Sequence, residues 1–316
     1  MSDFYEKLCL AAGKSPVKRE EPMSRHTTFR VGGPARYFVS PAGEKELAAV
    51  LALCREEGMP FYILGNGSNL LVSDGGYDGV MISMEEGFSG LELELVPYLD
   101  LDTEDVFAAA HYHVGAGVLL SRIAKAALED GMTGLEFAAG IPGTLGGAVV
   151  MNAGAYGGEI KDVLVSVRVM DCEGRIFDLE AGKLELGYRR SIIPEKQYIV
   201  LSAVLSLQQG EEDAIRGRME ELAAKRREKQ PLEYPSAGST FKRPAGYFAG
   251  KLIEDAGFRG YRHGGAAVSA KHCGFVINEE QATAEDILSL CRIVQKKVRE
   301  TAGVELELEI KLVGWK

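Results

Sequence analysis

The segment from Phe137 to Gly158 constrains the fold of this chain more than any other, because it is long enough to span a membrane and carries no charged residue. It also contains Pro142 and seven glycines. Such residues make a poor spanning helix, because irregular backbone leaves polar groups without partners in lipid. We therefore predict a buried region of loop and strand inside a folded domain, and we expect no insertion into a membrane.

Length, charge and cysteine content exclude several other classes of protein. With 316 residues the chain can form two or three domains. Its net charge of −10 argues against a general binder of nucleic acid or of membrane surfaces. The five cysteines form no Cys-x-x-Cys pair, which fits a reducing compartment rather than a disulfide framework. Because Met1 to Lys14 lacks the basic start and apolar stretch of a secretory signal, we expect a cytoplasmic protein.

Hydrophobic periodicity predicts a mixed α+β fold. Apolar residues three and four positions apart indicate amphipathic helices at Glu46 to Glu57 and at Leu119 to Asp130. Extended apolar runs indicate strands at Ala35 to Ser40, Pro60 to Leu64, Leu70 to Val72, His113 to Val114, Val163 to Asp171, Arg175 to Leu179 and Ile199 to Leu207.

The chain changes character after these strands. Glu211 to Lys229 is predicted to be a strongly charged helix that stops near Pro231 and marks a boundary between regions. Further on, Thr283 and Asp286 have the spacing of a helix-capping box, and Gly303 is a typical helix end. The buried face of this last helix is expected to hold Ile287, Leu288, Cys291, Val294 and Val298.

Two glycine-rich loops could cradle phosphate, because a missing Cβ lets backbone amides converge on an anion. Neither matches a Rossmann fingerprint, since Leu70 stands where a third glycine is needed, and no P-loop motif is present. Each loop taken alone is more simply explained as a tight turn, because glycine often marks turns. The residues of interest are Gly65, Asn66, Gly67, Ser68 and Asn69 in the first loop and Ala139, Gly140, Ile141, Pro142, Gly143, Thr144 and Gly147 in the second.

Four motifs in sequence order resemble those of the UDP-N-acetylenolpyruvoylglucosamine reductases, in the shorter type without an extra tyrosine-bearing loop. They are Thr28 to Gly33, Leu64 to Leu71, Glu136 to Gly143 and Met151 to Tyr156, and the resemblance extends from about Pro22 to Gly314. It implies a two-part FAD-binding domain of the vanillyl-alcohol-oxidase type, with the FAD pyrophosphate contacted by the residues of the two glycine-rich loops named above, followed by a C-terminal α/β substrate-binding domain. The expected boundaries are an N-terminal segment 1–21, an FAD-binding domain 22–209 with subdomains of about 22–85 and 86–209, and a substrate-binding domain 210–316.

The resemblance also implies a reaction. NADPH would reduce FAD, which would reduce UDP-N-acetylglucosamine enolpyruvate to UDP-N-acetylmuramate for peptidoglycan synthesis. Such chemistry requires a proton for C2 and hydrogen-bond donors around the substrate carboxylate. The family motifs place Arg189 at the developing enolate, Ser239 as the proton donor and Glu309 as an assisting acid.

The residues themselves leave alternatives to these assignments. Arg190 adjoins Arg189, Thr240 adjoins Ser239, and Ser236 lies three residues before it, so a nearby residue could be mistaken for the functional group. Leu308 stands where the family usually has proline. Alternation of polar and apolar residues predicts a strand with a solvated face formed by Glu305, Glu307, Glu309 and Lys311, opposite Leu306, Leu308, Ile310 and Leu312.

For the UDP moiety, the expected contacts are Tyr156 and Arg226, the latter in a basic cluster at the end of the charged helix. No metal is expected, because His111 and His113 share a strand face without a third ligand nearby. We expect a monomer. Two other functions stay open: a flavin oxidase of the same fold, for which no histidine tether is recognisable, and a non-catalytic nucleotide-sugar sensor.

Overall fold

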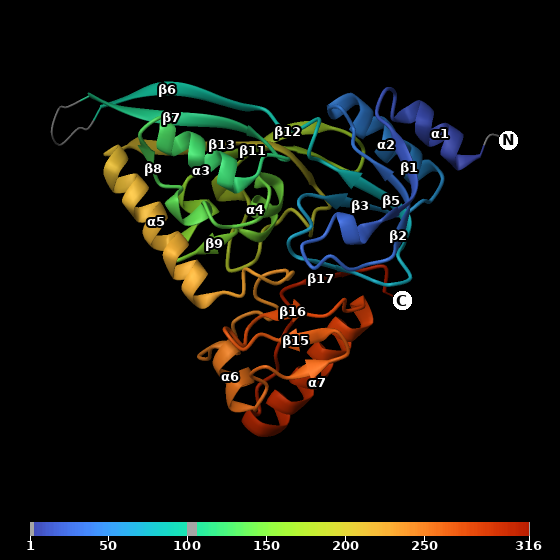
Figure 1. Cartoon of the computed structure of the whole chain (residues 1–316). Coiled ribbons are helices and arrows are strands. Elements are labelled where there is room, and N and C mark those ends of the chain that lie inside the picture. Colours follow the sequence, from blue (N-terminus) through green and yellow to red (C-terminus); the bar gives the residue numbers. More distant parts are fainter. Residues whose placement is uncertain (1–2, 100–105, 316) are drawn as a thin grey trace. The chain divides into compact units, whose positions relative to one another are not determined.

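The computed structural model describes residues 3–99 and 106–315, and the chain forms two compact units (Figure 1). The first unit comprises the residues up to Val17, Val39–Asn66 and Ile82–Ala224. The second comprises Lys18–Phe38, Gly67–Met81 and the residues from Lys225 onward. Met1 and Ser2 of the expected N-terminal segment, residues 100–105 and Lys316 lie outside the described residues.

An antiparallel sheet forms the centre of the first unit, with the strand order β12-β11-β13-β7-β6 and β8 added beside β13. Along β13 buried and partly exposed residues alternate, as expected for a sheet with one face in the core. Helix α4 packs on β13. The strands are β6 (Leu91–Leu99), β7 (Val106–Gly115), β8 (Met132–Thr133), β11 (Leu164–Met170), β12 (Ile176–Glu180) and β13 (Ile199–Gln209).

Helices of the first unit follow the predicted apolar patterns. Helix α2 (Glu44–Glu56) buries Leu47, Val50, Leu51 and Cys54, and α3 (Leu120–Glu129) buries Leu120, Ile123, Ala124 and Ala127. Both helices confirm the sequence prediction. Helix α1 (Phe4–Ala11), which packs on α2, was not predicted, and neither was strand β1 (Val17–Pro22).

The uncharged segment 137–158 is more helical than the prediction of loop and strand. It contains the end of a short 3-10 helix, η2 (Glu136–Ala138), then helix α4 (Leu145–Met151), and then a hairpin of β9 (Gly154–Ala155) and β10 (Gly158–Glu159). Packing stabilises α4 despite its low helix propensity, since the amides of Leu145 and Gly146 donate to the carbonyls of Val118 and Ala116 at 2.8 Å each. Among the described residues no helix has the length and apolar character needed to cross a membrane.

The second unit has its own core around helix α7 (Ala284–Ala302), which packs with α6 (Ala249–Asp255) and with the sheet β14-β15-β16 (Figure 1). The capping box of Thr283 and Asp286, the buried face and the left-handed Gly303 (φ 68°) all confirm the prediction for this helix. Asp74 adds a second cap, because its carboxylate accepts from the amides of Ala284 and Glu285 at 2.8 and 2.9 Å. The strands are β14 (Arg262–His263), β15 (Ala266–Val268) and β16 (Val276–Asn278).

The remaining elements complete the secondary structure. A further sheet has the order β1-β2-β5-β3, and β4 pairs in parallel with β17. Helix α5 confirms the predicted charged helix, with Ile215 and Leu222 buried. The bounds are β2 (Pro34–Val39), β3 (Phe61–Leu64), β4 (Leu70–Val72), β5 (Tyr77–Ser83), β17 (Lys311–Val313), α5 (Glu212–Lys229), η1 (Met23–Arg25), η3 (Ile160–Asp162) and η4 (Ala181–Lys183).

Candidate active site

Parts of the two predicted glycine loops meet inside the first unit. The Nδ2 of Asn66 donates to the carbonyl of Pro142 at 2.6 Å. A Cβ on Gly65 would lie 2.4 Å from Oγ1 of Thr144, so only glycine permits this approach of the two segments. The fold therefore joins residues separated by 76 positions into one cradle.

The second segment also presents backbone donors. Among the residues that the structure describes, the amides of Gly140, Gly143 and Thr144 donate to no protein acceptor. The amide of Ile141, by contrast, donates to the carbonyl of Ala138 at 2.9 Å. Three amides of this segment can thus receive an anion, whereas its other members must contribute through shape or side chains.

The rest of the first loop, residues 67–69, belongs to the second unit. A Cβ on Gly67 would lie 1.9 Å from the carbonyl oxygen of His26, so this position also requires glycine. The amide of Thr28 donates to the Gly67 carbonyl at 3.3 Å. The Thr28 hydroxyl is buried and has no hydrogen-bond partner among the described residues, and a buried polar atom of this kind indicates a place for a polar ligand.

Ser239 and Glu309 are brought together by backbone hydrogen bonds in the second unit. The amide of Glu309 donates to the carbonyl of Thr240, the residue after Ser239, at 2.9 Å. The hydroxyl of Thr240 accepts from the amide of Val276 at 2.9 Å and is fully buried. The Thr240 hydroxyl is therefore used in a structural hydrogen bond. The half-buried Ser239 hydroxyl is the better candidate of the two for donating a proton to substrate.

The predicted alternation of the last segment is wrong at Glu309. Its side chain is only 8% exposed, while Leu312, predicted to face the core, is 40% exposed. The reason is a change of partner along the chain: Leu308 pairs with Phe241, whereas Lys311 begins β17, which pairs with β4. Glu309 is thus a buried carboxylate and not a member of a solvated strand face.

Asn69 links the first glycine loop to this segment. Its Nδ2 donates to the carbonyl of Glu309 at 3.1 Å, and its own carbonyl accepts from the amide of Lys311 at 2.9 Å. The predicted cofactor loop and the predicted acid are therefore held by the same residue within the second unit.

Arg189 and Arg190 have different surroundings in the first unit. Arg190 is exposed, and it pairs with Glu185 at 3.4 Å and Glu195 at 3.2 Å. Arg189 is half-buried, has a left-handed backbone (φ 53°), and its guanidinium lies 5.1 Å from the ring centroid of Tyr188. The strained backbone and the stacked side chain distinguish Arg189 as the arginine with a fixed orientation.

The two residues predicted to bind UDP differ in exposure. Tyr156 is 38% exposed at the tip of the β9-β10 hairpin, where Tyr156 and Gly157 have φ angles of 54° and 94°. Two positive φ angles in a two-residue loop are typical of a type I′ turn, which holds the tyrosine outward. Arg226 is half-buried on α5.

Sequence reasoning missed Asn152 and Glu159 of the first unit. Asn152 is buried in a left-handed conformation, and its Nδ2 donates to Glu159 at 2.9 Å. The pKa of Glu159 is lowered, first by a hydrogen bond from Lys161 and also by the positive charge of Arg189. The asparagine after a glycine-rich helix could have indicated this, since Asn tolerates the left-handed region better than most residues.

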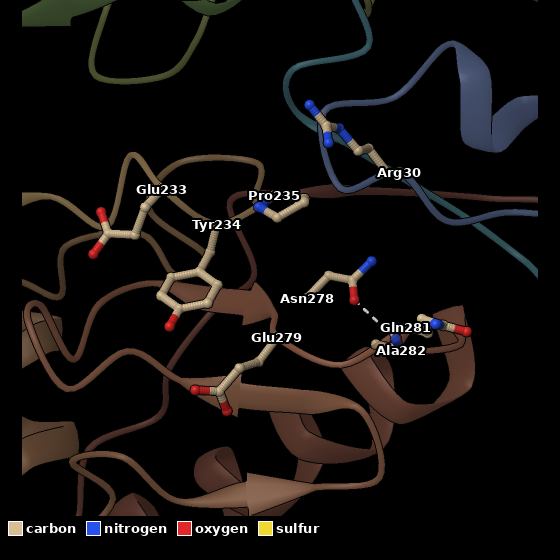
Figure 2. A pocket seen from close by; sticks show the side chains of 8 residues that line it. All are labelled: Arg30, Glu233, Tyr234, Pro235, Asn278, Glu279, Gln281 and Ala282. Carbon is tan, nitrogen blue, oxygen red and sulfur yellow. Dashed lines mark hydrogen bonds between the residues drawn. The ribbon is translucent and has the colours of Figure 1, made fainter.

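A polar pocket of about 480 Å³ in the second unit also lay outside the prediction (Figure 2). Asn278 holds its wall, because its Oδ1 accepts from the amide of Ala282 at 2.8 Å and its Nδ2 donates to the carbonyl of Phe29 at 3.0 Å. The pocket is lined by Arg30, Glu233, Tyr234, Pro235, Asn278, Glu279, Gln281 and Ala282.

The histidines of β7 do not form a metal site with neighbouring ligands. His113 pairs through Nε2 with Glu94 at 3.0 Å. Within residues 3–99 and 106–315, no group of three or more His, Cys, Asp or Glu side chains is arranged to hold a metal ion.

Known proteins resemble the chain over nearly its whole length. Residues 35–180 match the model of an FAD-binding domain, and residues 230–313 match that of the C-terminal domain of UDP-N-acetylenolpyruvoylglucosamine reductase. The reductase of Clostridioides difficile is 50% identical over 99% of this chain and 98% of its own, and that of Lachnoclostridium phytofermentans is 52% identical over 95% and 94%.

A solved structure agrees with these matches. The crystal structure of UDP-N-acetylenolpyruvylglucosamine reductase from Thermus caldophilus superposes with a TM-score of 0.76 at 35% identity, covering 95% of this chain and 99% of that one. The matches confirm the expected fold class, an α+β chain with an FAD-binding domain and a C-terminal reductase domain. The chain therefore belongs to the family of the UDP-N-acetylenolpyruvoylglucosamine reductases.

Proposed function

We propose that this chain is a flavin-dependent reductase that converts UDP-N-acetylglucosamine enolpyruvate to UDP-N-acetylmuramate, a peptidoglycan precursor, with NADPH as reductant. The observation that carries the proposal is the meeting of Asn66 with Pro142 and of Gly65 with Thr144, which builds one cradle from two distant segments. Family membership supports it, because the relatives bear the name of this reaction.

The residues of the cradle fit the pyrophosphate of FAD. Gly140, Gly143 and Thr144 supply amide donors, and Gly65 has no side chain to hold the two segments apart, whereas Gly67 allows its loop to lie against the His26 carbonyl. The remaining cradle residues, Asn66, Ser68, Asn69, Ala139, Ile141, Pro142 and Gly147, are proposed to complete the contact. When bound, FAD would supply the hydride-transfer chemistry between NADPH and C3 of the enolpyruvyl group.

Three side chains are proposed to manage the charge and the proton of the reaction. Arg189 donates to the substrate carboxylate as it becomes enolate-like, because a guanidinium matches the planar, bidentate geometry of that group. Ser239 gives the proton to C2. Glu309 assists from the segment that is hydrogen-bonded to the residue after Ser239.

A serine hydroxyl is a weak acid, so its proton transfer needs stabilisation of the alkoxide that remains. Lys242 follows Ser239 by three residues, but the ammonium of Lys242 pairs with Glu307 at 2.9 Å. We therefore propose that Lys242 does not stabilise the Ser239 alkoxide. In this proposal the stabilising groups are those that surround the substrate once it is bound.

Tyr156 and Arg226 are proposed to bind the diphosphate of the substrate, since a phenol and a guanidinium both donate hydrogen bonds to phosphate oxygens. The enzyme is further proposed to act as a monomer in the cytoplasm, with residues 22–209 binding FAD and 210–316 binding substrate. Sedimentation equilibrium of the purified chain tests the monomer.

The test of the function is the colour of the purified protein under anaerobic conditions. We expect a yellow protein that NADPH bleaches and that UDP-N-acetylglucosamine enolpyruvate restores to yellow. A bleached protein that only oxygen reoxidises would identify a flavin oxidase. A protein that binds the UDP-sugar but takes up no FAD would identify a nucleotide-sugar sensor.

A further inference from the structure

The side chain of Asn152 makes three hydrogen bonds at the end of helix α4. Its Nδ2 donates to the carbonyl of Gly187 at 3.1 Å and to Oε2 of Glu159 at 2.9 Å, and its Oδ1 accepts from the amide of Lys161 at 3.0 Å. An amide side chain has only two N–H donors, so both are in use. The residue is 1% exposed with φ 42° and ψ 59°, so its position is fixed by packing as well as by these bonds.

The Gly187 carbonyl is the base of the turn that carries Arg189. Gly187 and Arg190 form a closed pair, in which each amide donates to the other residue's carbonyl, at 3.0 and 3.2 Å. Asn152 adds a second hydrogen bond to the same carbonyl. The left-handed Arg189 lies within this closed turn, so a shift of Gly187 would carry the arginine with it.

Helix α4 holds the other flank of the turn as well. The hydroxyl of Ser191, which is 2% exposed, donates to the carbonyl of Val150 in α4 at 2.8 Å. Val150 near the end of this helix and Asn152 at its C-cap therefore hold the Arg189 turn by hydrogen bonds on both sides. The same helix begins directly after the glycine segment that is proposed to hold the pyrophosphate.

Asn152 also connects the turn to the carboxylate of Glu159, which interacts electrostatically with Arg189. Glu159 accepts from Asn152 and from Nζ of Lys161 at 2.7 Å, and the Arg189 charge contributes to the lowered pKa of this carboxyl. The two Nδ2 bonds of Asn152 thus fix the backbone of the arginine relative to a neighbouring carboxylate.

We propose that Asn152 is a positioning residue for Arg189: it sets the place of the turn so that the guanidinium meets the substrate carboxylate as negative charge develops. This role rests on the proposed function, in which Arg189 stabilises the enolate. Asn152 itself touches neither the substrate nor the cofactor in this role.

The test uses Asn152→Gly, which keeps the left-handed backbone without strain and removes all three side-chain hydrogen bonds. In stopped-flow experiments on the NADPH-reduced holoenzyme, we expect the limiting rate of reoxidation by the enolpyruvyl substrate to fall about 10-fold, as for a small misplacement of a catalytic group. The dissociation constant of the substrate should stay within about 2-fold, because the side chains of Tyr156 and Arg226 are retained and the β9-β10 pairing still holds the hairpin.

A double-mutant cycle separates positioning from general damage. In an Arg189→Ala background, Asn152→Gly should change the rate by less than about 2-fold, because the two residues act through one group. The exposed Arg190→Ala variant serves as the matched control and should react at the wild-type rate. A loss of the same size in both backgrounds would overturn the proposal.

A second measurement needs no substrate. Hydrogen exchange of residues 187–190 should rise about 10-fold in Asn152→Gly, while exchange in α7 stays unchanged. If the reduced wild-type enzyme is not reoxidised by the enolpyruvyl substrate, the proposed function fails, and exchange alone decides whether Asn152 holds the turn. Unchanged exchange at 187–190 would refute the role of Asn152 even in an active enzyme.

Discussion

Arg189 and Arg190 are adjacent in sequence, yet the fold gives only one of them a fixed orientation. Arg190 lies in an exposed ion-pair cluster, where single pairs contribute little to stability. Arg189 is stacked on Tyr188 in a strained turn. The motif containing both could be recognised from sequence, but the difference between them depends on the conformation of the turn, which places Glu185 and Glu195 beside Arg190.

Replacement of each arginine by lysine separates their roles. Arg189→Lys should slow substrate-driven reoxidation of the reduced flavin about 10²-fold or more, because lysine lacks the planar fork that suits a carboxylate. Arg190→Lys should leave this rate within about 2-fold. Stopped-flow absorbance of the flavin measures both rates. Equal losses in the two variants would remove Arg189 from its proposed role.

Ser239 allows a similar comparison with a neighbouring serine. Ser239→Ala should leave bleaching by NADPH intact while slowing reoxidation by substrate about 10²-fold, the usual range for loss of a general acid. Ser236→Ala is the control and should affect neither half-reaction. If Ser239→Ala slows both half-reactions equally, the serine does not act as the proton donor.

The burial of Glu309 could not be predicted from the local sequence pattern. Its alternating neighbours predicted a solvated strand face, and the structure buries it at 8% exposure because the chain changes pairing partner between Leu308 and Lys311. Such a change depends on long-range packing, which a local pattern does not contain. The resemblance to known reductases had selected the residue on other grounds.

Among the elements, helix α7 was predictable and helix α4 was not. Helix α7 carries its own start signal, apolar face and stop signal within 21 residues, from Thr283 to Gly303. Helix α4 is flanked by Thr144 and by the left-handed Asn152, but it has only seven residues, two of them glycine, and it depends on carbonyls of Ala116 and Val118 and on its packing against β13. Local signals therefore predicted elements that are locally encoded and missed those imposed by tertiary contacts.

The capping box of α7 should make stability depend on pH. Hydrogen bonds from the Thr283 backbone, with smaller contributions from other donors, lower the pKa of Asp286 from its ordinary 3.8. A lowered pKa in the folded state means that the carboxylate stabilises the fold above about pH 3.8 and loses this effect as the pH falls through the folded-state pKa.

Asp286→Asn tests this dependence. The variant should have a lower free energy of unfolding than the wild type at pH 7, and the difference should shrink as the pH approaches 3. Urea denaturation at a series of pH values measures it. The exposed Asp78→Asn variant, whose carboxylate pairs with Arg36 at 3.0 Å, is the matched control. If the difference in the free energy of unfolding stays constant with pH, the charge of Asp286 does not contribute to the stability of the cap.

At the scale of the whole molecule, the two units are interleaved in sequence. The chain passes between them within the first glycine loop, between Asn66 and Gly67, and again within α5, between Ala224 and Lys225. A change of composition near residue 210 predicted a boundary there, and composition could not reveal that residues 18–38 and 67–81 join the C-terminal unit. Contacts of this kind are set by topology rather than by local sequence.

Cofactor binding should stabilise the whole molecule, because a ligand that binds only the native state lowers its free energy. At a free FAD concentration of about 100 times its dissociation constant, the gain is about 2.7 kcal/mol. Riboflavin is the matched control, since it has the same ring system but no phosphate. We expect FAD to raise the midpoint of thermal unfolding much more than riboflavin does at equal concentration. Circular dichroism measures both midpoints. Equal shifts would show that the glycine cradle does not bind the pyrophosphate.

The cap that Asp74 supplies to α7 has a consequence for how this protein is made. Asp74 leaves the ribosome 210 residues before Ala284, whose backbone amide donates a hydrogen bond to its carboxylate. Until synthesis is nearly finished, the Asp74 carboxylate has no helix to cap and β4 has no β17 to pair with. The second unit can therefore be completed only at the end of translation, and a truncated chain that stops before Ala284 leaves this carboxylate with nothing to cap.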